Sequence, residues 1–373
     1  MMTGLLYLED GSIYRGKGFG AAATKVGEID FNTSMSGYQE LLTDPAATGL
    51  IVNMTYPLIG NYGISEIDNQ SDRVRAFGLV TRDISFRPSN RCSVMGISEW
   101  LLEQGVPGIY NVDTRAITKK IRMNGACKCV ISTEGISKDR AMELLVGTEL
   151  KADYMKSAGV DESVHVIGTE VNNYKVAVID FGIRKSTLDA LTGRGCEVIL
   201  VPYGAAADDI LAMKPDGLLL SDGPGAPLEC EAGIKAASDL MGKIPLFGIG
   251  MGHLVVALAA GGHTYKLKHG HRGAGQSVKD ALTGRTAITS QNHGYAVDAD
   301  SLKDSGLIVS HINLNDGSVE GLRHESFPAF TIAYAPEGKP GPNDSEVLYD
   351  DFVKMMHCHK LETKKGGGAD AQE

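Results

Sequence analysis

The chain has 373 residues, of which 43% are hydrophobic and 22% are charged, and its net charge is −10 at pH 7. These proportions are ordinary for a soluble globular protein, and the length allows two domains with separate cores. An acidic chain without a basic stripe is a poor match for nucleic-acid binding, and its apolar runs are too short to cross a membrane. We therefore expect a cytoplasmic protein that handles small molecules and contacts neither nucleic acid nor membrane.

Residues 1–150 combine short β-like runs with turns rich in glycine, proline, asparagine and aspartate. Apolar runs bounded by such turns predict strands, and apolar residues three or four positions apart predict helices. The strands are expected at residues 4–8, 29–32, 50–54 and 77–80, and the helices at 98–104, 115–123 and 138–145. This order predicts a mixed α+β domain at residues 1–150, followed by a linker with some local structure at 151–173.

The six cysteines are scattered without the regular spacing of a disulfide framework, so reduced thiols are expected. Cys127 and Cys129 flank one lysine, and Cys358 stands between two histidines, but no second ligand pair follows at a zinc-site spacing. Alternation on one face of a strand accounts for Cys127 and Cys129. We therefore assign no metal ligands in this chain.

A second domain is predicted at residues 174–362, where the character of the sequence changes. Residues 176–180 form an uninterrupted apolar run, which is typical of a strand covered on both faces. Helices expected at 185–192, 207–213 and 229–241 then alternate with strands expected at 197–201, 217–221 and 245–248. This order predicts an α/β fold with a mostly parallel sheet covered by helices. Residues 363–373 have almost no apolar content, so a disordered tail is expected.

The most informative segment, Gly248-Ile249-Gly250-Met251-Gly252, lies between an apolar strand and an apolar helix. A strand, Gly-x-nucleophile-x-Gly and a helix form the pattern of a nucleophile elbow, a tight turn that raises a serine or cysteine into a cleft. Here the central position is Gly250, which has no side chain. The sequence thus predicts the scaffold of a catalytic site without its reacting atom.

Blocks in both halves of the chain resemble known families, in the same order from the first strand to about residue 359. The C-terminal half resembles class I glutamine amidotransferases, and the N-terminal half resembles the small chain of carbamoyl-phosphate synthase. The C-terminal blocks are Asp180-Phe181-Gly182, Leu220-Ser221-Asp222-Gly223-Pro224-Gly225, the elbow, Ser290-Gln291-Asn292-His293-Gly294-Tyr295 and Pro336-Glu337. The N-terminal blocks include Ser34-Met35-Ser36-Gly37-Tyr38-Gln39-Glu40, Thr43-Asp44-Pro45, Thr55-Tyr56-Pro57-Leu58-Ile59-Gly60-Asn61 and Asp113-Thr114-Arg115.

The resemblance implies a glutaminase site. In the family a cysteine thiolate attacks the glutamine amide, a histidine transfers the proton and a glutamate orients the histidine, while backbone N–H groups at the Gly-Pro-Gly turn and the elbow stabilise the oxyanion. By position, the cysteine falls on Gly250 and the histidine on Ala335, and only the glutamate is kept, as Glu337. The chain therefore resembles a variant without the catalytic Cys and His, a loss that lowers turnover by about 10⁶-fold.

The positions that contact glutamine in the family have also drifted. Ala46 replaces a serine and Leu254 a glutamine, while Asp222 replaces an asparagine and adds a charge that would oppose an oxyanion. The family glutamine-site positions fall on Ala46, Gly223, Gly225, Met251, Leu254, Asn292, Gly294 and Tyr295.

Three interpretations follow, and the first is preferred. In the first, the chain is a partner of the large, ATP-using chain in carbamoyl phosphate synthesis for arginine or pyrimidines. Its glutaminase site is inactive, ammonia is the nitrogen source, and ATP and Mg bind to the large chain, with no cofactor on this one. In the second, it is a non-catalytic regulatory or ligand-binding paralogue whose pocket holds another metabolite or is filled by Tyr334. In the third, it is a glutaminase with a displaced nucleophile, for which Cys230 is the nearest thiol in sequence.

Overall fold

The computed structural model describes residues 2–150, 154–166 and 172–366, and the chain divides into two compact units. Unit 1 comprises Met1–Tyr154 and Leu267–Gly275, and unit 2 comprises Met155–Lys266 and Gln276–Glu373. The return of Leu267–Gly275 to unit 1 differs from the predicted boundaries, which left this segment in the second domain. A buried ion pair holds it there, with Arg272 Nε 2.9 Å from Asp30 Oδ2. Such a long-range pair leaves no local pattern in the sequence.

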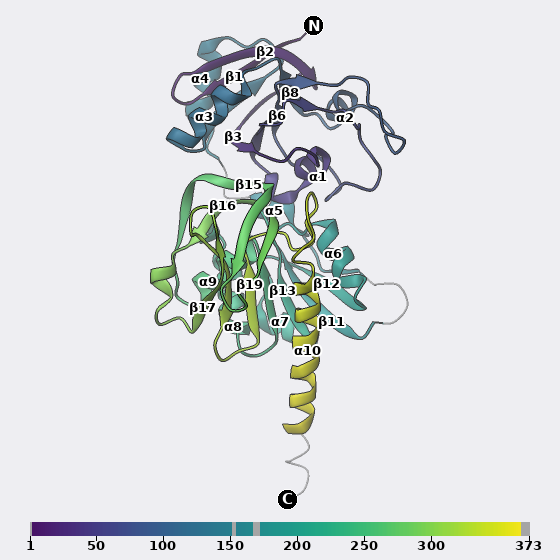
Figure 1. The fold of residues 1–373 in the computed structure, drawn as a ribbon, viewed down its shortest axis with the longest axis vertical. Coiled ribbons are helices and arrows are strands. Elements are labelled where there is room, and N and C mark those ends of the chain that lie inside the picture. The colour runs from purple at the N-terminus through teal and green to yellow at the C-terminus, as the bar shows by residue number, and fades with distance from the viewer. Residues whose placement is uncertain (1, 151–153, 167–171, 367–373) are drawn as a thin grey trace, which may run out of the picture. The chain divides into compact units, whose positions relative to one another are not determined.

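Unit 1 is built on a closed β-barrel (Figure 1). Its first and last strands in the chain pair with each other, which closes the sheet without exposed edges. The interior is apolar and includes Ile29, Ile51, Ile109 and Ile131. Around the barrel the strands run β1 (Thr3–Leu8), β2 (Ile13–Gly20), β8 (Pro107–Tyr110), β6 (Gly78–Val80), β4 (Leu50–Met54), β3 (Thr24–Asn32) and β9 (Cys127–Ser132).

Helices and short strands surround this barrel. The amphipathic α3 (Thr114–Asn124) buries Ile117 and Ile121 in the barrel core and begins at Asp113, whose side chain accepts a hydrogen bond from the backbone N–H of Ala116. Cys127 and Cys129 of β9 contact the same core, as expected for alternate residues of one strand. The remaining elements are α1 (Tyr38–Thr43), η1 (Pro45–Ala47), β5 (Leu58–Ile59), β7 (Asp83–Ile84), α2 (Ile97–Glu103) and α4 (Lys138–Gly147).

Unit 2 contains the predicted parallel sheet. Five strands run parallel in the order β12 (Cys196–Pro202), β11 (Tyr174–Asp180), β13 (Gly217–Leu220), β14 (Leu246–Ile249) and β19 (Ala329–Ile332). Alternate residues face opposite sides, so Ala177 and Ile179 enter one core and Val176 and Val178 the other. Helices α7 (Ala207–Ala212), α8 (Glu231–Leu240) and α9 (Met251–Ala259) cover the first side, and α6 (Lys185–Thr192) and α10 (Val347–Gly366) the second.

Antiparallel strands extend this sheet at both edges, a feature that the sequence analysis did not predict. One edge strand is β10 (Val164–Val166), which pairs with β12 and shows that part of the predicted linker belongs to unit 2. The other strands are β15 (Thr264–Asp280), β16 (Thr286–Val297), β17 (Leu307–Asn313) and β18 (Val319–His324). Short elements complete the order: α5 (Tyr154–Ala158), η2 (Pro227–Glu229) and η3 (Ala299–Leu302).

The predicted disordered tail is wrong for its first residues, because α10 continues to Gly366. Within this helix no proline or glycine precedes Gly366. Residues 367–373 lie outside the described residues, as do 151–153 and 167–171 of the predicted linker. Among the described helices, none is long and apolar enough to cross a membrane.

Candidate functional site

The elbow expected from the sequence is present between β14 and α9. Gly250 has φ 54° and ψ −108°, a conformation that residues with a side chain rarely adopt, and its N–H donates to Ile332 O at 2.9 Å. Gly252 allows α9 to approach β13, since a Cβ at this position would lie 2.2 Å from Leu220 O. The backbone hydrogen bond of Gly250 and the close packing of Gly252 against β13 therefore keep the turn in place.

The space beside Gly250 is occupied by the carboxylate of Asp222. A Cβ placed on Gly250 would lie 2.0 Å from Asp222 Oδ1 and 2.3 Å from its Cγ. Both distances are far below any tolerated contact, so a nucleophile side chain and Asp222 in this position exclude each other. The elbow thus lacks a nucleophile, and a neighbouring side chain fills the place where one would begin.

The same carboxylate engages the backbone groups expected to stabilise an oxyanion. The N–H groups of Gly223 and Met251 both donate to Asp222 Oδ1, at 2.8 and 3.0 Å. Gly223 belongs to the Gly-Pro-Gly turn after β13, and Met251 is the first residue of α9. The N–H groups at the positions expected for oxyanion donors therefore already bind a carboxylate of the chain itself.

Ala335 takes part in the fold through its backbone alone. Its N–H donates to Ser290 O at 3.0 Å, which forms an isolated bridge between the two residues. A methyl group cannot transfer a proton, so this position supplies neither the base nor the acid of the family mechanism.

Glu337, the conserved acid position, is buried within a network of donors. Ser186 Oγ and Thr187 Oγ1 donate to Glu337 Oε1 at 2.8 and 3.2 Å, and Tyr349 OH donates to Oε2 at 2.9 Å. Arg184 Nη1 lies 3.5 Å from Oε1, and both side chains of this pair are 5% exposed. Burial, assisted by the neighbouring carboxylate, raises the pKa of Tyr349 well above its usual range, so the phenol stays protonated and donates. In these contacts Glu337 thus binds only side chains that belong to the fold, and its role in them is structural.

The former glutamine positions in unit 2 have two kinds of environment. Leu254 and Tyr295 contact one apolar cluster with Val297, Leu302 and Leu322, and Met251 is buried in the core under α9. Leu254 is thus a core residue at the position where the resemblance implies a glutamine. Four others are partly exposed on the turn after β13 or on β16, namely Gly223, Gly225, Asn292 and Gly294.

Ala46 belongs to unit 1 and lies in η1. Its N–H donates to Asp44 Oδ1 at 3.0 Å, which caps this short helix, and its side chain is buried. An alanine here offers no hydroxyl to a ligand.

Two residues considered as alternatives have other environments. Cys230 is fully buried, and burial raises the pKa of its thiol to about 11, so it does not form a thiolate near neutral pH. Tyr334 is buried in the core between the sheet and α10, whereas Asp222 fills the space beside the elbow. Filling of the former pocket by Tyr334 stays a prediction.

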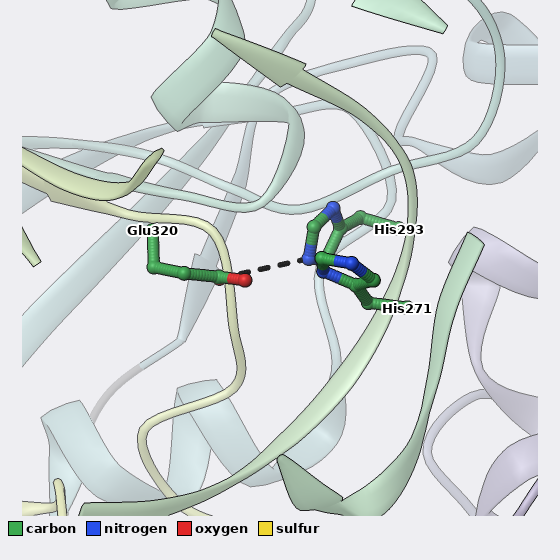
Figure 2. Close-up of side chains that lie close together, drawn as sticks. All are labelled: His271, His293 and Glu320. Atoms are coloured by element: carbon green, nitrogen blue, oxygen red, sulfur yellow. Dashed lines mark ion pairs between the residues drawn. The ribbon is translucent and has the colours of Figure 1, made fainter. Parts of the chain in front are cut away.

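A buried polar group near the drifted positions was missed by the sequence analysis. Figure 2 shows the carboxylate of Glu320, on β18, directed toward the ring of His293, on β16; His271, also labelled, belongs to unit 1. His293 Nε2 lies 3.6 Å from Glu320 Oε2, and Asn313 Nδ2 donates to Oε1 at 2.8 Å. A glutamate between apolar residues of a strand, as in Val319-Glu320-Gly321-Leu322, was the available signal.

His253, in the first turn of α9, is also fully buried. Its Nδ1 lies 2.8 Å from Thr331 Oγ1, and burial lowers its pKa to about 3. The imidazole is therefore neutral at physiological pH and joins α9 to β19.

Comparisons with known proteins match both halves of the chain. Residues 6–131 match the family model for the CPSase domain of the carbamoyl-phosphate synthase small chain, and residues 177–355 match that for class-I glutamine amidotransferases. The first region covers the barrel of unit 1, and the second covers the parallel sheet and the elbow of unit 2.

Full-length relatives agree with these domain matches. Proteins described as carbamoyl phosphate synthase small chains are 47% identical in Clostridium acetobutylicum, over 95% of this chain and 100% of the relative, and 44% identical in Fusobacterium nucleatum, over 94% and 97%. A third, from Staphylococcus haemolyticus, is 45% identical over 94% of this chain and 95% of its own. The chain therefore belongs to the carbamoyl-phosphate synthase small-chain family.

Proposed function

We propose that this protein is a carbamoyl-phosphate synthase small subunit whose glutamine-hydrolysing site is inactive. One observation carries the proposal: the carboxylate of Asp222 lies where the side chain of a nucleophile at position 250 would begin. The absence of a thiol at the elbow removes the covalent step, and the carboxylate also binds the N–H groups that a tetrahedral intermediate would need.

The other parts of the family mechanism support the same proposal. Ala335 provides no base, and Glu337 is engaged by four side chains of the fold. Cys230 is the thiol nearest to the elbow in sequence among the alternatives considered, and its raised pKa keeps it protonated. A glutamate without a histidine to orient, and a thiol without a base, do not make a nucleophile.

The role of the chain then rests on its partner. The relatives' description as small chains supports a complex with the large, ATP-using chain, which makes carbamoyl phosphate for arginine or pyrimidine synthesis. Ammonia supplies the nitrogen in this proposal, and ATP with its magnesium ions binds to the large chain. The barrel of unit 1, whose residues 6–131 match the small-chain family model, is intact and supports a retained partnership.

Carbamoyl phosphate formation by the cognate large chain tests the proposal. The large chain is assayed with and without this protein, and with glutamine or ammonium as the only nitrogen donor. We expect this protein to form a stable complex with the large chain and to change the rate of carbamoyl phosphate synthesis from ammonium. With glutamine as the only nitrogen donor, we expect no carbamoyl phosphate synthesis. Glutamine with an added unrelated glutaminase is the control, since it shows that the assay detects released ammonia.

Two results would contradict parts of the proposal. Synthesis from glutamine alone would show an active glutaminase and overturn the assignment of Gly250 and Ala335. No complex and no response with either donor would instead support a regulatory or ligand-binding paralogue. The complex is measured separately, by sedimentation, so that loss of partnership and loss of glutaminase activity are distinguished.

A further inference from the structure

A cavity on the surface of unit 1 brings charged and apolar side chains together, away from the elbow and the acid position. Its volume is about 460 Å³, which is within the size range of clefts that bind ligands. The side chains that line it come from β2, from β5 and β7 with the residues before them, and from the end of β8. They include Lys17, Leu58, Arg82, Asp83 and Tyr110. Segments distant in the sequence therefore form one face of unit 1.

The charge of this face is opposite in sign to that of the whole chain. Lys17 and Arg82 are exposed cations and Asp83 is the one acid among the lining residues, whereas the chain as a whole has a net charge of −10. Within the part of the chain that the structure describes, no ion pair engages Lys17 or Arg82. Asp83 Oδ1 accepts a hydrogen bond from Ile84 N at 2.8 Å, so its own backbone binds this carboxylate. The face is thus complementary to an acidic surface.

Aromatic rings lead from the core of unit 1 to the same face. Tyr110 packs edge-on against the buried Phe19 with ring centroids 6.1 Å apart, and Phe86 packs edge-on against Tyr110 at 5.6 Å. Lys17 Nζ lies 5.9 Å from the centroid of the Tyr110 ring. Phe86 is 55% exposed, and Leu58 is 38% exposed. Aromatic residues and arginine are enriched at protein–protein interfaces and contribute most of their binding energy, so this combination indicates a protein partner.

The backbone that presents Phe86 is held in place by the segment that contains β5. Ser85 N donates to Ile59 O at 2.8 Å. Beyond Phe86, Ser89 N donates to Asn61 O at 2.9 Å. The exposed ring thus belongs to a loop that is already fixed, and little conformational entropy is lost when a partner covers it.

We propose that this face of unit 1, formed by Lys17, Leu58, Arg82, Phe86 and Tyr110, docks an acidic surface of the large chain, with a carboxylate of that chain in the cavity beside Lys17 and Arg82. The inference rests on the proposed function, which supplies the partner. Phe86 and Leu58 lose their contact with water in the complex, and the two cations steer the approach of the large chain.

Binding of the full chain to the cognate large chain is measured by surface plasmon resonance at low and at high ionic strength. We expect Phe86→Ser to raise Kd at least about tenfold, mainly through faster dissociation, because its apolar contact is lost. Arg82→Glu should slow association at least about tenfold at low ionic strength, and less at high ionic strength, because salt screens the charge. Lys17→Glu should act in the same direction. The melting temperature of each variant shows that it is folded.

Two matched controls lie elsewhere in unit 1. Val146, on α4, is 83% exposed, and Lys25 is an exposed cation on β3. Around the barrel, β1 and β9 separate β3 from β2, and β4 and β6 separate it from β8. Val146→Ser and Lys25→Glu should therefore leave Kd within about twofold of the wild type, which is less than about 0.5 kcal/mol.

Three results would overturn the proposal. If the wild type forms the complex and the variants bind as tightly as the controls, the interface lies elsewhere and the proposed partnership stands. If the wild type does not bind the large chain, the partnership and this inference fall together. If the chain alone self-associates in sedimentation and Phe86→Ser abolishes this, the face belongs to a second copy of the chain and not to the large chain.

Discussion

The elbow and the acid position of unit 2, two positions expected from the resemblance to belong to one triad, have different surroundings. At the elbow, position 250 has no side chain and Asp222 fills the space beside it, whereas Glu337 is bonded to Arg184, Ser186, Thr187 and Tyr349. A nucleophile makes few contacts with the fold, because it must face a substrate. A buried carboxylate that satisfies several donors cannot be removed without leaving them unpaired. Packing alone is therefore enough to account for a glutamate at position 337.

The largest loss of stability is expected at Glu337, if this residue serves its hydrogen-bond network and not catalysis. Glu337→Ala removes the buried carboxylate that pairs with Arg184 and accepts from Ser186, Thr187 and Tyr349, so the free energy of unfolding should fall by about 3–5 kcal/mol. Urea denaturation measures this change. Glu346→Ala is the matched control, since Glu346 pairs with Arg194 at 3.5 Å but is 40% exposed, and its loss should cost about 1 kcal/mol or less. Equal losses in the two variants would show that the Glu337 network does not stabilise the fold.

A smaller effect on the free energy of unfolding is expected from the pH dependence of His253, the buried histidine beside the elbow. The pKa of His253 is lowered from 6.5 to about 3, so below pH 6.5 the unfolded chain takes up a proton that the folded chain does not. Stability is therefore lost as the pH falls from 6.5 toward 3. When the pH is lowered from 7.5 to 5.0, the free energy of unfolding of the wild type should fall by about 2 kcal/mol more than that of His253→Asn. This follows because each pH unit below 6.5 contributes about 1.4 kcal/mol.

Thr331→Val is the control for this comparison. It removes the hydrogen-bond partner of His253 and leaves the imidazole buried, so the variant should keep the pH dependence of the wild type. Urea denaturation at the two pH values measures the free energy of unfolding of the wild type and of both variants. The same pH dependence in His253→Asn and in the wild type would exclude His253 as the cause.

The smallest effect is expected from the negative charge of Asp222 on the pKa of a thiol introduced at the elbow. In Gly250→Cys the introduced side chain must displace the Asp222 carboxylate from its present position, and a carboxylate that stays near the thiol should raise the pKa of the thiol and lower its thiolate fraction. Alkylation by iodoacetamide at pH 7 should be about tenfold faster in Gly250→Cys/Asp222→Asn, which corresponds to a pKa difference of about one unit. Cys92 and Cys358 are also exposed, so mass spectrometry must resolve the modified peptides. Equal alkylation rates would mean that Asp222 moves away when a side chain is present at position 250.

The sequence by itself determined the family and the two kinds of fold, and it placed a glycine and an alanine at the positions expected for the nucleophile and the base. Helical periodicity placed α6 at 185–192, and uninterrupted apolar runs placed the parallel strands, because these elements depend on local patterns. The elbow could be located because its glycines are needed by the turn itself, whatever residue stands at its centre.

Only the tertiary structure decided what surrounds these positions. Four features join residues far apart in the chain: Asp222 beside Gly250, the donors around Glu337, the pairing of Glu320 with His293, and the return of Leu267–Gly275 to unit 1. The sequence indicated that a negative charge lay near the former oxyanion donors, but it could not show that one carboxylate both binds them and fills the nucleophile's place. That outcome depends on side-chain positions, which are set by packing between segments and not by the order of residues within one of them.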